Sequence, residues 1–198
     1  MNKIKIVFFE DESNDYKKYI KIIHETFEKI KKDYNYLDIE VIQIIDNYSD
    51  IKKLISEYLQ CSPNSKTSFR KILESFNLFD KDIIYFLDEK WGNTIDAGST
   101  FFSSYLHDEN CDNSANAIII THYSASPKHD GMQYIQKSDA IKDTKSLRNK
   151  ITSTNVFKEI QQKFEKKQKA SVKNKKIKDT SLKEIFPNKE DPKYEKIK

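Results

Sequence analysis

Five short apolar runs, separated by stretches with helical periodicity, constrain the fold of this chain more than any other feature of its sequence. Each run is six to eight residues long, and most are continuous rather than alternating, as expected for strands that are buried on both faces of a sheet. The runs occupy residues 3–9, 38–45, 82–88, 116–121 and 132–137. Because strands that alternate with helices form βαβ units, this order predicts a parallel sheet covered by helices.

The stretches between the runs carry apolar residues at the spacing of one helix face. The first of them has a stripe made of Tyr16, Ile20, Ile23, Phe27 and Ile30. Ser13 or Asn14 is the expected N-cap of that helix. Further helices are expected over residues 49–59, 68–79, 99–107 and 143–169, with a break near Thr152. We therefore predict an α/β fold with a doubly wound five-stranded parallel sheet in the flavodoxin-like order 2-1-3-4-5.

The length and the charge distribution predict one folded domain with a basic extension. A chain of 198 residues is long enough for one sizeable core. We expect a domain over residues 1–155, a helical extension over 156–170 and a basic, largely disordered tail over 171–198. Residues 158–198 contain fourteen lysines and seven acidic residues, whereas the whole chain has a net charge of +4. The tail could contact a nucleic-acid backbone, but the interleaved acids argue against that function.

The sequence contains no signal for a membrane. No apolar run approaches the roughly 20 residues that a spanning helix needs. The first residues do not resemble a signal peptide, because their apolar stretch is short and acids follow it. We expect a cytoplasmic protein that does not bind membranes.

Chemically useful side chains follow several of the predicted strands. Strand one is followed by Glu10, Asp11 and Glu12, while strands three, four and five end at Asp88, Thr121 and Lys137. The carboxyl ends of parallel strands meet at one edge of a sheet, so these groups should converge there. Clustered carboxylates repel one another, and a hard divalent cation such as Mg²⁺ removes that conflict. One carboxylate could then act as a nucleophile toward a phosphoryl group, with the lysine and the threonine hydroxyl opposite it.

The same motifs resemble the receiver domain of bacterial two-component response regulators, over about residues 2–155. "IKIVFFEDES" is similar to that family's first strand and acidic pair, and "IIYFLDEK" to its phosphoacceptor strand. "AIIITHYS" and "GMQYIQKSD" are similar to its fourth and fifth strands, and "DAGSTFFSSYL" to its third helix, with Gly98 in the glycine position.

The resemblance implies a phosphorelay protein rather than a conventional enzyme, with at most self-catalysed phosphoryl transfer to and from an aspartate. Asp88 would be the phosphoacceptor, and Thr121 and Lys137 would hold the phosphoryl oxygens. The remaining implied roles are Mg²⁺ ligation by Asp11, Asp88, the Lys90 carbonyl and, through water, Glu10, and an aromatic switch at Tyr134. A histidine kinase or a phosphotransfer protein would be the partner, and the output protein is not implied.

The sequence also departs from the family pattern. The acidic pair is Glu-Asp, and Ser138 stands where the family usually has a proline. Only sixteen positions separate Thr121 from Lys137, so we expect the fourth helix to be shortened or missing.

These departures leave two alternatives open. The chain could be a degenerate receiver that binds a partner protein without phosphorylation. Residue by residue, Asp88 could instead be a strand-terminal acid that caps a turn, and Tyr134 could pack in the core. A phosphatase or nuclease on a related sheet is the other alternative, but the D-x-D motif that it needs is missing at the expected strand end.

Overall fold

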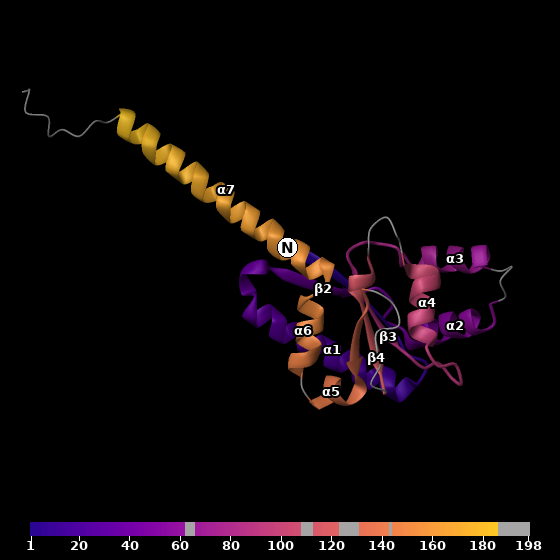
Figure 1. Cartoon of the computed structure of the whole chain (residues 1–198). Helices are drawn as coiled ribbons and strands as arrows, with labels where there is room; N and C mark the ends of the chain where they lie inside the picture. Colours follow the sequence, from indigo (N-terminus) through magenta and orange to yellow (C-terminus); the bar gives the residue numbers. More distant parts are fainter. Residues whose placement is uncertain (62–65, 108–112, 123–130, 143, 186–198) are drawn as a thin grey trace, which may run out of the picture. The chain divides into compact units, whose positions relative to one another are not determined.

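A computed structural model contains the five-stranded parallel sheet that the sequence predicts. It describes residues 1–61, 66–107, 113–122, 131–142 and 144–185. The strand order is β2-β1-β3-β4-β5, all pairs are parallel, and helices flank the sheet, so the fold is flavodoxin-like (Figure 1). The strands are β1 (Asn2–Phe9), β2 (Ile39–Gln43), β3 (Ile83–Asp88), β4 (Ala117–Thr121) and β5 (Gln133–Gln136).

The strand register places the ends of four strands at one edge of the sheet. Phe9 of β1 pairs with Leu87 of β3, so the residues that follow each of them, Glu10 and Asp88, are neighbours. Thr121 of β4 pairs with Gln136 of β5, and Lys137 follows directly. The backbone hydrogen bonds of the sheet therefore bring residues from distant parts of the sequence to a common edge.

The helices form two layers. On one side of the sheet, α1 (Ser13–Asp33), α5 (Lys137–Lys142) and α6 (Thr144–Thr152) pack against one another. Figure 1 shows α2 (Tyr48–Leu59), α3 (Lys66–Ser75) and α4 (Ala97–Phe101) on the other side. A π-helical turn, Phe102–Leu106, continues α4, and α7 (Asn155–Ile185) follows α6. Short 3₁₀ turns cover Asn35–Leu37 and Asn113–Asn116.

A cluster of aromatic rings fills the space between the sheet and the second layer. Tyr58 of α2 lies 5.6 Å from Trp91 and 5.1 Å from Phe101, measured between ring centroids. Phe9 of β1 lies 5.0 Å from Phe101, and Trp91 is fully buried. The loop after β3, which carries Trp91, is therefore anchored in the core.

Several element boundaries differ from the prediction. The N-cap position of the first helix is Glu12 rather than Ser13 or Asn14, and the Glu12 side chain makes no capping hydrogen bond. Lys137 begins α5 instead of ending the fifth strand, because the chain turns into a helix immediately after Gln136. The prediction that the fourth helix is shortened or missing concerns mainly residues 123–130, which lie outside the described residues.

The C-terminal helices follow the predicted break near Thr152. The interruption lies between α6 and α7, where the hydroxyl of Thr154 accepts a hydrogen bond from the Phe157 amide at 3.3 Å. By its contacts the chain divides into two units, Met1–Ile160 and Gln161–Lys198. The helix α7 continues to Ile185, beyond the predicted limit of the helical extension at residue 170. Within the described ranges, no helix combines the length and the apolar character that crossing a membrane requires.

Gly98 allows α4 to approach the end of β3 closely, and this contact can be tested. A Cβ atom at position 98 would lie 2.1 Å from the backbone oxygen of Asp88 and 3.2 Å from the Cβ of Leu87. We expect Gly98→Ala to lower the free energy of unfolding by about 1–3 kcal/mol, because backbone atoms must move to admit the methyl group. Urea unfolding followed by the fluorescence of Trp91, the single tryptophan, measures the change.

Thr100→Ala in the same helix is the matched control, since Thr100 is exposed. It should leave the unfolding midpoint nearly unchanged. Equal midpoints for the two variants would show that α4 does not constrain the end of β3.

Candidate functional site

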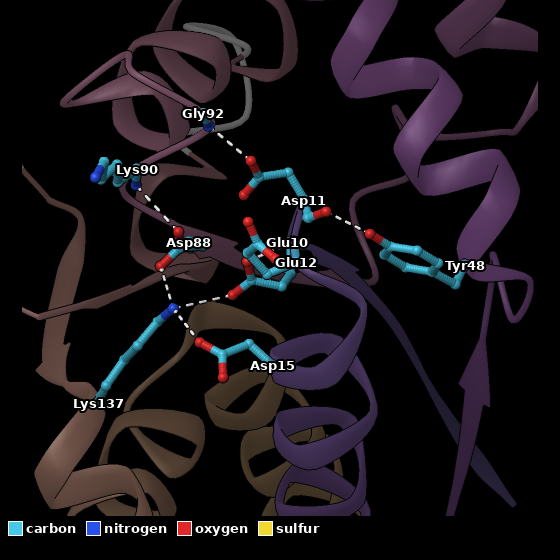
Figure 2. A network of polar contacts seen from close by, with 9 residues as sticks. All are labelled: Glu10, Asp11, Glu12, Asp15, Tyr48, Asp88, Lys90, Gly92 and Lys137. Carbon is cyan, nitrogen blue, oxygen red and sulfur yellow. Dashed lines mark hydrogen bonds and ion pairs between the residues drawn. The ribbon is translucent and has the colours of Figure 1, made fainter.

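The ammonium group of Lys137 lies at the centre of a network of carboxylates at the edge of the sheet (Figure 2). Its Nζ atom is 3.1 Å from Oε2 of Glu10, 3.0 Å from Oδ1 of Asp88 and 2.9 Å from Oδ2 of Asp15. The side chains of Lys137 and Asp88 are each only 4% exposed, and that of Glu10 is 1% exposed. Lys137 also lies 5.4 Å from the ring centroid of Tyr19. One buried cation therefore joins β1, β3, α1 and α5.

Asp11 connects the end of β1 to the loop after β3. Its Oδ2 atom accepts a hydrogen bond of 2.6 Å from the Gly92 amide, and its backbone carbonyl accepts one from the Tyr48 hydroxyl of α2. The Asp11 side chain is half-buried, and a groove of about 330 Å³ borders it, lined mainly by α2 and the first turn of α1. Asp11 can thus be reached from this groove.

Asp88 and Glu89, two consecutive acids, face different partners. Oδ2 of Asp88 accepts a hydrogen bond of 3.2 Å from the Lys90 amide, while Oδ1 faces Lys137. Glu89 is also buried, and its carboxylate accepts hydrogen bonds from the Ser99 amide at 3.1 Å and the Ser99 hydroxyl at 2.8 Å. Glu89 therefore fixes the start of α4, whereas Asp88 belongs to the site.

Burial determines the electrostatics of the cluster. Burial and the negative charge of Asp88 raise the pKa of Glu10 from 4.5 to about 8, although Lys137 opposes the change. Burial also raises the pKa of Asp88, against the effect of Lys137. Burial alone would lower the pKa of Lys137, but hydrogen bonding to Asp15 and the charges of Asp88 and Glu10 outweigh it and raise the pKa. The raised pKa of Glu10 therefore favours its protonated form near neutral pH, beside the lysine ammonium.

Three of the acids could hold a metal ion. Glu10, Asp11 and Asp88 each offer a carboxylate oxygen, and these three oxygens lie within 4.8 Å of one another. A divalent cation there would neutralise part of the negative charge of these acids and would displace a proton from Glu10. The donor set consists of hard oxygen atoms, and this chemistry fits such an ion.

The structure brings together most of the residues that the sequence predicts for the site. Glu10, Asp11, Asp88 and Lys137 form one network, and Lys90 joins it through its backbone amide. The role of the Lys90 carbonyl as a metal ligand stays a prediction.

Thr121 lies on β4, the strand that pairs with β3, and Tyr134 lies on β5, the strand beyond β4. Thr121 is buried at the end of β4, and Tyr134 is half-buried on β5, opposite Ile119. Their roles as a phosphoryl ligand and a switch stay predictions.

Sequence reasoning missed Asp15, which belongs to the site, and Glu89, which fixes the start of α4. Asp15 lies four positions before Tyr19 on α1, so both residues share the helix face toward Lys137. That spacing was visible in the sequence. Glu89 was hidden by its neighbour Asp88, which the strand-end pattern favoured.

Comparison with known proteins adds no relative: no family model, no curated protein and no solved structure matches the chain.

The raised pKa of Glu10 predicts how stability depends on pH. A carboxyl whose folded pKa is about 8 and whose unfolded pKa is about 4.5 stabilises the folded state fully below pH 4.5. This contribution is lost as the pH rises toward 8, because the unfolded chain then releases the proton first. Without added metal, the free energy of unfolding should fall between pH 5 and pH 8, with Glu10 contributing roughly 1 kcal/mol per pH unit.

Glu10→Gln removes the titrating group and keeps a similar shape, so the comparison isolates Glu10 from other titrating residues. Urea unfolding of both proteins in buffers containing a chelator provides the measurement. We expect the variant to gain stability relative to the wild type as the pH rises. Parallel pH profiles for the two proteins would refute the raised pKa.

Proposed function

We propose that the chain is an atypical receiver domain that accepts a phosphoryl group on Asp88. The observation that carries the proposal is the buried pair of Asp88 and Lys137, 3.0 Å apart at the carboxyl edge of the sheet, with Glu10 and Asp11 beside it. An aspartate carboxylate is a suitable nucleophile for a phosphoryl group, and a lysine can balance the charge that arrives with it. The sequence motifs that resemble receivers converge on the same four residues.

Mg²⁺ is the metal that we propose for the acidic cluster. It prefers carboxylate oxygens, keeps several of its waters and accepts a phosphate oxygen, which suits a site with few protein ligands. Glu10, Asp11 and Asp88 would hold it, and the Lys90 carbonyl could contribute a further oxygen. When bound, the ion would offset negative charge on the transferred phosphoryl group.

The residues of the chain would divide the remaining work. An oxygen of Asp88 forms the new O–P bond while the bond between phosphorus and the donor breaks. Lys137 shifts its hydrogen bond from Oδ1 of Asp88 to a phosphoryl oxygen, and Thr121 donates to another. Asp11 keeps the loop after β3 in place through the Gly92 amide.

The proposal implies a phosphohistidine donor on a histidine kinase or a phosphotransfer protein in the cytoplasm. The domain would not be a conventional enzyme, since transfer to and from Asp88 would be its only chemistry. The protein that reads the phosphorylated state stays unidentified.

A second function is favoured by the closed ion network. Lys137 has three N–H donors, and three carboxylates already face it. Such a network occupies every N–H donor of Lys137, which suits a degenerate receiver that binds a partner protein independently of phosphorylation. The two functions differ in whether Asp88 reacts.

Phosphorylation of Asp88 is the direct test of the proposal. Incubation with acetyl phosphate and Mg²⁺ should add one phosphoryl group, detected by intact mass spectrometry and removed by hydroxylamine, as expected for an acyl phosphate. Asp88→Asn should abolish the addition, because the amide lacks the nucleophilic carboxylate. Asp82→Asn, just before the opposite end of β3, is the matched control and should be modified like the wild type. An unmodified wild type, or a modified Asp88→Asn, contradicts the receiver function.

Metal binding gives a separate prediction. Mg²⁺ should raise the melting temperature by ligand linkage, and more strongly at pH 8 than at pH 6, because the ion must displace the proton from Glu10. Asp11→Asn should reduce the shift, whereas Glu12→Gln should retain it, since Glu12 lies outside the triad of acids. Differential scanning fluorimetry measures the shifts. A melting temperature that does not change with Mg²⁺ favours the degenerate receiver that binds a partner protein independently of phosphorylation.

A further inference from the structure

Asp15 is a third carboxylate partner of Lys137 that the receiver assignment does not use. It lies in the first turn of α1, and its Oδ2 atom is 2.9 Å from Nζ of Lys137, the shortest of the three ion pairs of that lysine. Its side chain is 32% exposed, whereas those of Glu10 and Asp88 are almost fully buried. Asp15 therefore holds the same cation from the solvent side of the network.

The three partners of Lys137 differ in what else they can bind. Glu10 and Asp88 belong to the set of acids that could hold a metal ion, and Asp15 does not. If a divalent cation occupied that set, the oxygens of Glu10 and Asp88 would be shared with it. Asp15 would then be the partner whose charge remains directed at Lys137 alone.

A phosphoryl group on Asp88 would need that same ammonium. It would bring additional negative charge into a region where Asp15 already contributes one, and like charges at short distance oppose each other. Lys137 has only three N–H donors, so a bond to a phosphoryl oxygen must replace or share one of its present bonds. Charge repulsion and the limited number of N–H donors therefore both make Asp15 a competitor of the phosphoryl group for Lys137.

We infer that Asp15 is a positioning residue that competes with the phosphoryl group for Lys137 and thereby limits the affinity of the site for that group. The inference rests on the proposed receiver function. It predicts that loss of the Asp15 charge strengthens binding of a phosphoryl mimic even though it removes an ion pair from the folded protein.

Beryllofluoride with Mg²⁺, titrated into the full chain and followed by isothermal titration calorimetry, tests the inference. Asp15→Asn should bind the mimic roughly three- to fivefold more tightly than the wild type, the ratio expected for a partly exposed charge pair. Asp15→Glu, which restores the charge, should bind within twofold of the wild type. Glu12→Gln removes a nearby acid that forms none of the ion pairs of Lys137, and it should also remain within twofold.

A second measurement separates this role from a structural one. Urea unfolding without the mimic should show that Asp15→Asn is less stable than the wild type, so stability and affinity change in opposite directions. A purely structural role would lower stability and leave affinity unchanged or weaker, and either result overturns the inference.

The outcome for the wild type decides where a failure lies. If the wild type does not bind beryllofluoride, both the receiver function and the role of Asp15 are rejected. If the wild type binds it and Asp15→Asn binds equally or more weakly, only the role of Asp15 is rejected.

Discussion

The ammonium of Lys137, enclosed by the carboxylates of Glu10, Asp15 and Asp88, is the interaction on which the arrangement of the sheet edge depends. A buried charge is costly to remove from water, and it is tolerated only where opposite charges and hydrogen bonds replace the lost hydration. Lys137 and Glu10 are 127 positions apart in sequence, so this compensation exists only when β1, β3, α1 and α5 are in place together. The network thus stabilises one register of the strands and one position of α1 and α5.

The loop after β3 connects the ion network to the helices on the other face of the sheet. Asp11 holds it through the Gly92 amide, Trp91 anchors it among aromatic rings, and Glu89 holds Ser99 at the start of α4. Gly98 lets α4 approach the backbone of Asp88 more closely than any side chain would permit. The position of Asp88 is therefore set from both layers of helices, although only one layer contains Lys137.

The strand-end pattern was sufficient to predict this part of the structure because it depends on backbone geometry. Parallel strands with regular crossovers place Glu10, Asp88, Thr121 and Lys137 at one edge whatever the loops do. The contacts of individual side chains were harder to predict from the sequence. Asp15 reaches Lys137 only because α1 has a particular rotation about its axis, and Glu89 turns toward α4 because consecutive residues of an extended chain project to opposite sides. The apolar stripe indicates which face of α1 is buried, but it does not show that Asp15 at the edge of that face reaches Lys137. The length of the final strand, which ends before Lys137, does not follow from apolar periodicity either.

The charge of the cluster links the two functions that we consider. Three acids, Glu10, Asp15 and Asp88, face one ammonium, and Asp11 lies beside Glu10 and Asp88, so the site requires a further positive charge to approach balance. A proton on Glu10, whose pKa is about 8, supplies it without metal, and a divalent cation on Glu10, Asp11 and Asp88 would supply it at the expense of that proton. A receiver needs the metal-bound state to form at cellular pH and Mg²⁺ concentration. A degenerate receiver that only binds a partner protein needs no more than the protonated, metal-free state. Because a pKa near 8 makes the displaced proton inexpensive to release at neutral pH, the burial that closes the network does not by itself prevent a cation from entering it.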